Sequence, residues 1–229
     1  MIKGIQVTLY DVFGYLLPGS ILLTGVVGLF WAILAPATPL VWPQVINENW
    51  IVIAVASYVC GHLAQALANM VTKHLPSIES LVLTKGGNDD LPEPVVAAAR
   101  SKASSILAVD AKGVDSSLLY QICDETVAQL GITSDRDIYI YREGFYRGLT
   151  ISLLFLCGAL LVRATIPGTT LKLSDTLQSL RWPELVSLAL LSLGSAWLSF
   201  NRYRRFGRYR VKQAILGFLL LHTKAIKEK

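Results

Sequence analysis

The sequence predicts an all-α membrane protein with four transmembrane helices, a helical cytoplasmic insert between the second and third spans, and a basic cytoplasmic C-terminal helix. Hydrophobic residues make up 53% of the 229 residues and charged residues only 16%, a balance typical of membrane proteins. Two long stretches carry no charge, and most Lys and Arg residues lie on one side of the predicted spans. Composition, uncharged length and charge distribution therefore agree on one fold class.

The first two spans are the clearest. Residues 14–35 contain no charged residue across 22 positions, which gives a helix of about 33 Å against a hydrocarbon core of about 30 Å. Residues 50–71 form a second uncharged stretch, and 148–166 and 185–200 are shorter candidates. We expect an interfacial N-terminal helix and first transmembrane hairpin at 1–71, a cytoplasmic helical insert at 72–147, a second transmembrane hairpin at 148–203 and a basic cytoplasmic tail helix at 204–229.

The first apolar run also has features of a cleavable signal peptide, because Ala35 and Ala37 form an A-x-A pattern. However, the run is longer than the about 7 to 15 residues usual in such peptides, and Lys3 alone supplies the basic start. We therefore expect a retained span.

Positive charge orients the spans. Residues 1–13, 72–147 and 201–229 hold 18 of the 21 Lys and Arg residues, whereas 36–49 hold none. Because positive residues favour the cytoplasmic side, both termini and the insert are expected in the cytoplasm of a multi-pass protein in the bacterial inner membrane.

The N-terminal approach to the first span combines a capping motif with a proline. Thr8 and Asp11 match the S/T-x-x-D/E capping box of a helix start. Pro18 removes the hydrogen bond to the Gly14 carbonyl, so a kink eased by Gly14 and Gly19 is expected where the chain enters the bilayer. The alternative function of this stretch is an inner-mouth site lined by Asp11 and Tyr15.

Polar side chains follow one face of the second span, at spacings of four, three and four. They are Tyr58, His62, Gln65 and Asn69. Such side chains are costly in hydrocarbon and should face the bundle, a partner subunit or water. They are interpreted as hydrogen-bonding contacts between helices, with an ion-lining row titrated by His62 as the alternative. The candidate binding residues are Asp11, Tyr15, Tyr58, His62, Gln65 and Asn69.

Pairs of small residues four positions apart in the same span predict a close approach between helices. Gly25 and Gly28 are expected to serve likewise in the first span. The pairs on the second span are Ser57 with Gly61 and Ala64 with Ala68.

Catalytic and metal-binding patterns are absent from the sequence. Cys60, Cys123 and Cys157 form no C-x-x-C motif, and no nucleotide-binding or hydrolase motif is found. The sequence contains no internal repeat of the kind expected in a transporter. Arg163 lies close enough to the outer end of its span for its side chain to snorkel to the interface. We therefore expect no enzyme activity, catalytic residue, metal or cofactor.

The insert is expected to be helical. Glu93 begins one predicted helix, and a second helix from Ser116 to Gly131 has an apolar face. Ser134 is expected to cap a third helix that continues into the third span. Asp89 and Asp90 with Glu93 are interpreted as part of a solvated turn rather than a cation site. The apolar face of the second helix comprises Leu119, Ile122, Val127 and Leu130.

The C-terminal tail carries six basic residues between positions 202 and 212, interleaved with aromatic residues. Anionic lipid of the inner leaflet attracts such a cluster by about 1 kcal/mol per charge, and nucleic acid is the less favoured partner. The following segment, to Leu221, is expected to lie at the interface or pack on the insert. The predicted lipid-contacting residues are Arg202, Arg204, Arg205, Arg208, Arg210 and Lys212.

Four short motifs carry a family resemblance. They are aromatic-D-x-x-G-Y-L-x-P-G at 10–19, S-Y-x-x-G-H at 57–62, F-Y-R-G-L at 145–149 and R-Y-R-R-F at 202–206. With them the chain resembles a group of small bacterial four-helix inner-membrane proteins, and its layout resembles membrane components of anti-phage defence systems. The resemblance implies an effector or anchor that acts beside a soluble sensor.

The sequence thus favours a non-enzymatic, homo-oligomeric inner-membrane protein, which anchors or perturbs the membrane and engages a cytoplasmic partner or signal. The alternative is a small ion channel or proton-coupled transporter that uses the polar face of the second span. A third hypothesis, an enzyme acting on lipid, requires a catalytic acid such as Asp11 at the inner face.

Overall fold

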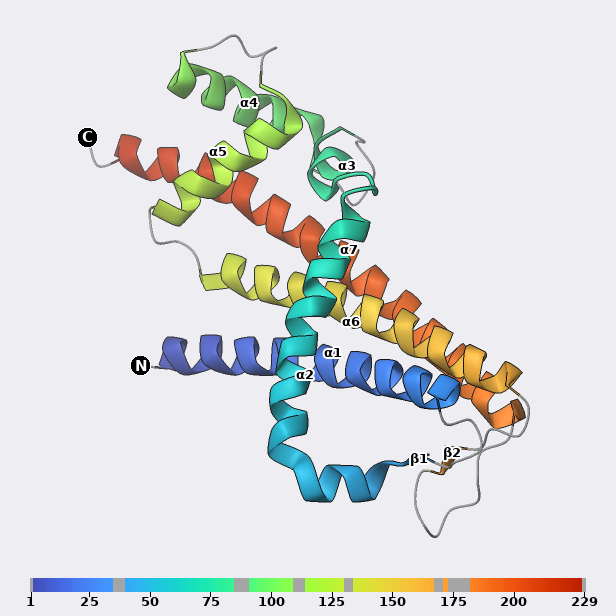
Figure 1. The fold of residues 1–229 in the computed structure, drawn as a ribbon. Helices are drawn as coiled ribbons and strands as arrows, with labels where there is room; N and C mark the ends of the chain where they lie inside the picture. Colours follow the sequence, from blue (N-terminus) through green and yellow to red (C-terminus); the bar gives the residue numbers. More distant parts are fainter. Residues whose placement is uncertain are drawn as a thin grey trace. The chain divides into compact units, whose positions relative to one another are not determined.

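The computed structural model describes the backbone of residues 2–34, 40–84, 91–108, 114–129, 134–166, 171–172 and 182–227. The side chains of residues 2–11, 32, 40–48, 134–136, 171–172 and 221–227 lie outside the description. The described elements are α1 (Ile2–Leu34), β1 (Leu40–Val41), α2 (Trp42–Thr72), α3 (Ile78–Thr84), α4 (Glu93–Leu107), α5 (Ser116–Gln129), α6 (Ser134–Thr165), β2 (Leu171–Lys172) and α7 (Trp182–Lys227) (Figure 1).

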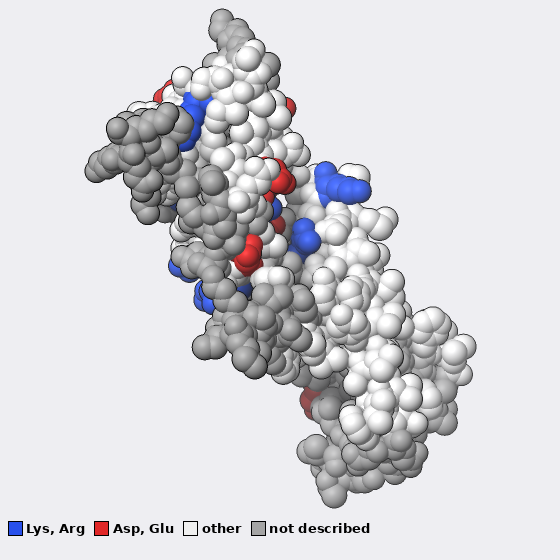
Figure 2. Space-filling model, turned by 90° about the vertical axis from the view of Figure 1, so that its left-hand side faces the viewer, with Lys and Arg blue, Asp and Glu red and all other residues white. Residues whose placement is uncertain are grey.

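Four of these helices are long and apolar enough to cross a membrane. The candidate spans are Val12–Trp31 in α1, Asn49–Thr72 in α2, Asp137–Thr165 in α6 and Trp182–Leu220 in α7. Figure 2 shows groups of described charged side chains beside a broad surface of other residues. The prediction of a helical, multi-pass membrane protein with four spans is confirmed.

The described chain divides into two compact units. The span unit comprises Met1–Val71 and Gly144–Tyr203, and the insert unit comprises Thr72–Glu143 and Arg204–Lys229. Both α6 and α7 contribute residues to each unit. Segments far apart in the sequence therefore build each unit.

In the span unit, α1 and α2 approach until their backbones touch. A Cβ atom at Gly19 would overlap the Ser57 carbonyl oxygen, and one at Gly61 would overlap the Tyr15 carbonyl oxygen. Ala64 and Ser57 are buried on the same face of α2, and α2 crosses α1 (Figure 1). The small residues of α2 therefore permit close packing, as predicted.

The first span contains two glycines with different surroundings. A Cβ at Gly25 would lie 3.2 Å from the Leu156 Cα atom of α6, whereas a Cβ at Gly28 would meet no described atom within 4 Å. Gly25 serves the predicted close approach. The same prediction for Gly28 is wrong.

The start of α1 differs from the prediction. The helix begins at Ile2 and continues as one element through Pro18 to Leu34, so the separate interfacial helix starting near Thr8 is wrong. Residues 2–7 contain no proline, and nothing ends a helix before the capping-box motif. Gly19 provides a backbone contact with α2.

The backbone of α2 leaves helical geometry at one residue. Asn49, with φ −132° and ψ 29°, separates residues 42–48 from the span. The expected loop at 36–49 is therefore helical from Trp42. Pro43 suits this helix start because the first-turn N–H groups have no partner within the helix. Trp182 and Pro183 repeat the arrangement at the start of α7.

Two short strands also belong to the span unit. β1 and β2 pair in parallel, with Leu40 opposite Leu171 and Val41 opposite Lys172. This pairing joins the segment before α2 to the segment after α6, and the sequence analysis missed it.

The insert unit packs α3, α4 and α5 with the C-terminal part of α7. α4 begins at Glu93 and α6 begins at Ser134, where helices were predicted, while α3 was missed. On α5, Leu119 and Val127 are buried as predicted, Ile122 is half-buried, and Leu130 lies outside the described residues. The buried residues are Ile78, Val82 and Leu83 of α3, Val96, Ala99 and Ala103 of α4, Leu119, Tyr120, Cys123 and Val127 of α5, and Val211, Ala214, Ile215 and Phe218 of α7.

Candidate functional site

Three of the predicted binding residues form an aromatic cluster between α1 and α2. The His62 ring stacks on Tyr15 at 4.1 Å between centroids, and Tyr58 meets His62 edge-on at 4.9 Å. Gly61 brings the α2 backbone against Tyr15, which places the rings in contact. His62 and Tyr58 nevertheless remain exposed on the surface of the span unit.

Gln65 has a different role from its neighbours on the polar face. Its Nε2 atom donates to the Gly144 carbonyl of α6 at 2.5 Å. A Cβ at Gly148 would lie 2.7 Å from Nε2, so the amide occupies space left by a missing side chain. The Oε1 atom is buried without a hydrogen-bond partner among the described residues. Gln65 therefore joins α2 to α6.

The remaining predicted binding residues are Asn69 and Asp11. Asn69 is exposed on α2. Asp11 belongs to α1, but its side chain lies outside the described residues. The structure thus brings Tyr15, Tyr58 and His62 together and directs Gln65 to another helix.

The contacts of α6 were missed by the sequence analysis. Gly144 and Gly148 form a G-x-x-x-G pair, the spacing that permits close approach of membrane helices. Further along, Ser192 of α7 donates to the Leu153 carbonyl at 2.8 Å. The spacing of Gly144 and Gly148 was the sequence signal for the contact with Gln65. No sequence signal indicated the contact between Ser192 and Leu153.

Arg210 is the centre of an ion-pair network in the insert unit. Its Nη2 atom lies 2.8 Å from Glu79 Oε1, and its Nε atom lies 2.8 Å from Glu143 Oε2. The guanidinium also lies 5.0 Å from the centroid of the Tyr120 ring. These contacts leave the side chain 19% exposed, so we remove Arg210 from the residues expected to contact lipid.

Arg205 is arranged differently. It is exposed, its Nε donates to the Tyr209 hydroxyl at 3.0 Å, and its guanidinium lies 5.4 Å from that ring. Arg142 of α6 is also exposed and lies 5.5 Å from the Phe206 ring. Arg142 was not among the predicted lipid-contacting residues, because sixty residues separate it from the basic tail.

The other predicted lipid-contacting residues remain at the surface to different degrees. Arg202 of the span unit is exposed, and Arg204, Arg208 and Lys212 of the insert unit are half-buried.

A buried thiol and a partly buried amine lie in the insert unit. Lys102 Nζ donates to the Phe218 carbonyl at 2.5 Å and lies 4.3 Å from the Phe218 ring. Burial lowers the pKa of Lys102. Burial raises the pKa of the Cys123 thiol to about 12. A thiol with so high a pKa is a poor nucleophile and metal ligand at neutral pH.

Arg163 is buried, and the three cysteines are free thiols. Arg163 is 2% exposed, so its predicted snorkelling is not what the structure shows: it packs within the span unit. The three cysteines form no disulfide. Among the described residues, no group of three His, Cys, Asp or Glu side chains could hold a metal ion. Asp89 and Asp90 lie outside the described residues.

The fold and these sites define the class as a multi-pass α-helical membrane protein. Comparison of the chain with protein-family models, curated proteins and solved structures finds no match.

Proposed function

We propose that the protein is a non-enzymatic, homo-oligomeric inner-membrane effector or anchor, whose insert unit lies in the cytoplasm and engages a protein partner or signal. The observation that supports this proposal is the continuity of α7. Its 46 residues extend about 69 Å, roughly twice the about 30 Å hydrocarbon core. A helix that crosses the membrane therefore continues into the insert unit.

The contacts of α7 explain how a partner could act on the spans. Arg210 is ion-paired to Glu79 and Glu143, and Lys102 binds the Phe218 carbonyl. Because the C-terminal part of α7 is held by α3, α4 and α6, a partner that displaces the insert helices also acts on a membrane-spanning helix.

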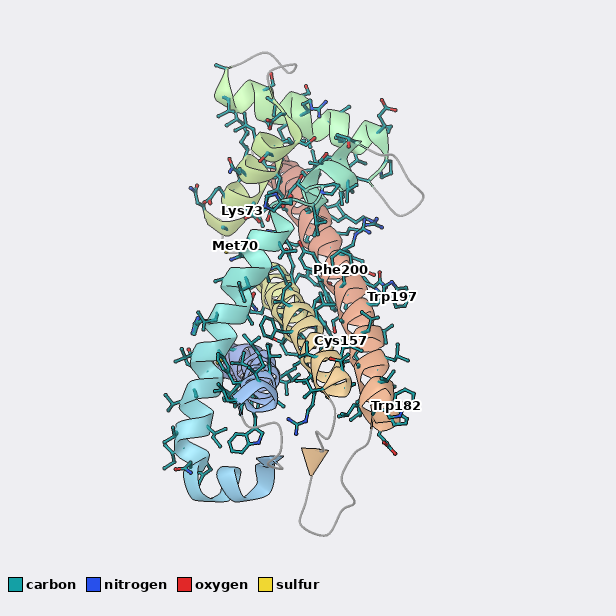
Figure 3. All side chains as sticks on the ribbon, turned by 45° about the vertical axis from the view of Figure 1, so that its right-hand side comes forward. Met70, Lys73, Cys157, Trp182, Trp197 and Phe200 are labelled. Carbon is teal, nitrogen blue, oxygen red and sulfur yellow. The ribbon has the colours of Figure 1, made fainter. Side chains whose placement is uncertain are left out.

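The exposed surface of α2 supports self-association. His62 and Tyr58 lie exposed near the middle of the Asn49–Thr72 span, where polar side chains facing lipid are costly. The exposed surface of α2 also includes the apolar residues Leu63 and Leu67, and that of α7 includes Leu190, Leu191 and Trp197, which projects from the helix in Figure 3. In the proposed oligomer, α2 faces a second copy and α7 faces lipid.

The ion-channel alternative receives less support from this geometry. A conducting row needs water along the polar face of α2. Instead, His62 stacks on Tyr15 and Gln65 donates to Gly144. These contacts engage part of the row with α1 and α6 rather than with water.

Phage challenge of bacteria carrying the gene with its neighbours tests the effector proposal. We expect fewer plaques and loss of membrane potential during infection, but an intact potential in uninfected cells. Arg210→Met should abolish both responses, whereas Arg208→Met should retain them. Unchanged plaque counts with the wild-type genes would contradict the defence role.

Purified protein in liposomes tests the channel alternative. The proposal predicts no constitutive ion flux. Constitutive flux that His62→Ala abolishes would replace the effector proposal with the channel.

A further inference from the structure

We propose that the insert unit carries a binding surface for the phosphodiester headgroup of an anionic phospholipid. The surface, called here the arginine–aromatic surface, consists of Arg142 and Arg205 with the rings of Tyr139, Phe206 and Tyr209. This proposal rests on the proposed inner-membrane placement. It adds to that function a specific class of ligand and binding residues from α6.

The three rings of the surface form one cluster. Tyr139 lies 6.3 Å from Phe206 and 5.6 Å from Tyr209 between centroids, and Phe206 lies 6.4 Å from Tyr209. Tyr139 comes from α6 and the other two rings come from α7. Aromatic contacts between the helices therefore fix the platform on which both guanidinium groups rest.

The two arginines retain hydrogen-bond donors. Arg205 uses Nε for Tyr209, which leaves both Nη atoms, and Arg142 contacts only the face of Phe206 among the described residues. Neither is ion-paired with a described carboxylate, in contrast to Arg210. A guanidinium with free donors and a partly desolvated ring beneath it matches the oxygens of a phosphodiester.

Helix length places the surface at headgroup depth. From Trp182 to Phe206 along α7, and from Arg142 to Thr165 along α6, the rise is about 35 Å in each case. This distance slightly exceeds the about 30 Å hydrocarbon core. Trp182, at the start of α7, is 67% exposed, so the two ends of the 182–206 segment carry the aromatic borders typical of membrane spans. A phospholipid therefore fits this surface better than nucleic acid.

Native mass spectrometry of the full-length protein in detergent tests the proposal. Phosphatidylglycerol is the probe, phosphatidylcholine is the zwitterionic control, and inorganic phosphate separates a lipid site from a free-phosphate site. We expect bound phosphatidylglycerol and neither of the others. The Arg142→Gln/Arg205→Gln variant should bind at least about tenfold more weakly, because it loses the charge-assisted hydrogen bonds to the phosphodiester.

Lys73→Gln is the matched control for a single charge, since Lys73 is exposed in the insert unit outside this surface, and should bind like the wild type. Arg142→Lys/Arg205→Lys keeps the charge without the planar donors and should bind with intermediate strength. Unchanged melting of the lipid-free variants shows that they fold. Equal binding of both lipids, binding of phosphate alone, or a double variant equal to Lys73→Gln would overturn the proposal. Binding does not depend on phage challenge or orientation, so its failure is distinct from failure of the proposed function.

Discussion

At the scale of single residues, the span unit depends on glycines that cannot carry a side chain. Gly61 lies against the Tyr15 carbonyl, whereas a Cβ at Gly158 of α6 would meet no described atom within 4 Å. The two glycines therefore separate the effect of packing from that of helix propensity.

Gly61→Ala should lower the free energy of unfolding by about 1–3 kcal/mol, because the helices must separate to admit the methyl group. Gly158→Ala should raise it by up to about 1 kcal/mol, because alanine favours the helix. SDS-induced unfolding followed by tryptophan fluorescence measures both. Equal shifts in the same direction would contradict the close α1–α2 contact.

Arg210→Met should destabilise the insert unit by about 3–5 kcal/mol, because it leaves the buried Glu143 and the half-buried Glu79 without their cation. The alkylation rate of Cys123, in a variant without Cys60 and Cys157, reports the opening of this unit. Alkylation should accelerate in Arg210→Met and stay slow in Arg208→Met, since Arg208 has no ion pair among the described residues. Equal rates would show that the network does not hold the unit together.

Cys123 should also make stability depend on alkaline pH. Burial raises its pKa from 9.0 to about 12, so the folded state retains a proton that the unfolded state loses. The resulting stabilisation is complete below pH 9 and is lost as pH rises from about 9 to about 12, by at most on the order of 4 kcal/mol. Cys123→Ala should show a shallower decline in denaturant midpoint over this range. Identical slopes would exclude a buried, protonated thiol.

At the scale of elements, the long helices were predictable because apolar length and charge distribution are local properties of the sequence. The start of α1 was not, because Thr8 and Asp11 match a capping box whether or not a helix precedes them. The seven residues of α3 are too few to show a periodic pattern.

The sites were less predictable than the helices. The polar face of α2 was visible from spacing, but the choice of Gly144 as the acceptor for Gln65 depends on how α6 packs. The partners of Arg210 lie 131 and 67 positions away, at Glu79 and Glu143. Only tertiary structure distinguishes this paired arginine from Arg208, which has no ion pair among the described residues.

The continuity of α7 is itself testable. Asn201→Pro should interrupt the helix, because proline removes the hydrogen bond to the Trp197 carbonyl and costs about 3 kcal/mol. Asn201 is exposed, so no buried contact is lost. We expect trypsin to cleave after Arg202, Arg204 or Arg205 faster than in Asn201→Ala. Equal cleavage would show that α7 is already interrupted in the wild type.

At the scale of the whole molecule, the proposed function requires that the insert unit face the cytoplasm. The evidence for this orientation is the distribution of Lys and Arg along the sequence. Two exposed positions report opposite sides: Ser101 on α4 of the insert unit and Thr165 at the end of the α6 span.

Single cysteines at these positions, in a chain with Cys60, Cys123 and Cys157 replaced by Ala, allow a direct measurement with a membrane-impermeant maleimide. In intact spheroplasts, Thr165→Cys should be labelled and Ser101→Cys should not. After permeabilisation both should react, which confirms that Ser101→Cys is accessible. Because about 35 Å of helix separates Arg142 from Thr165, the membrane keeps the two ends of the α6 span on different sides. The reverse labelling pattern would place the insert unit outside the cell and remove the anionic inner leaflet as the source of lipid for the arginine–aromatic surface.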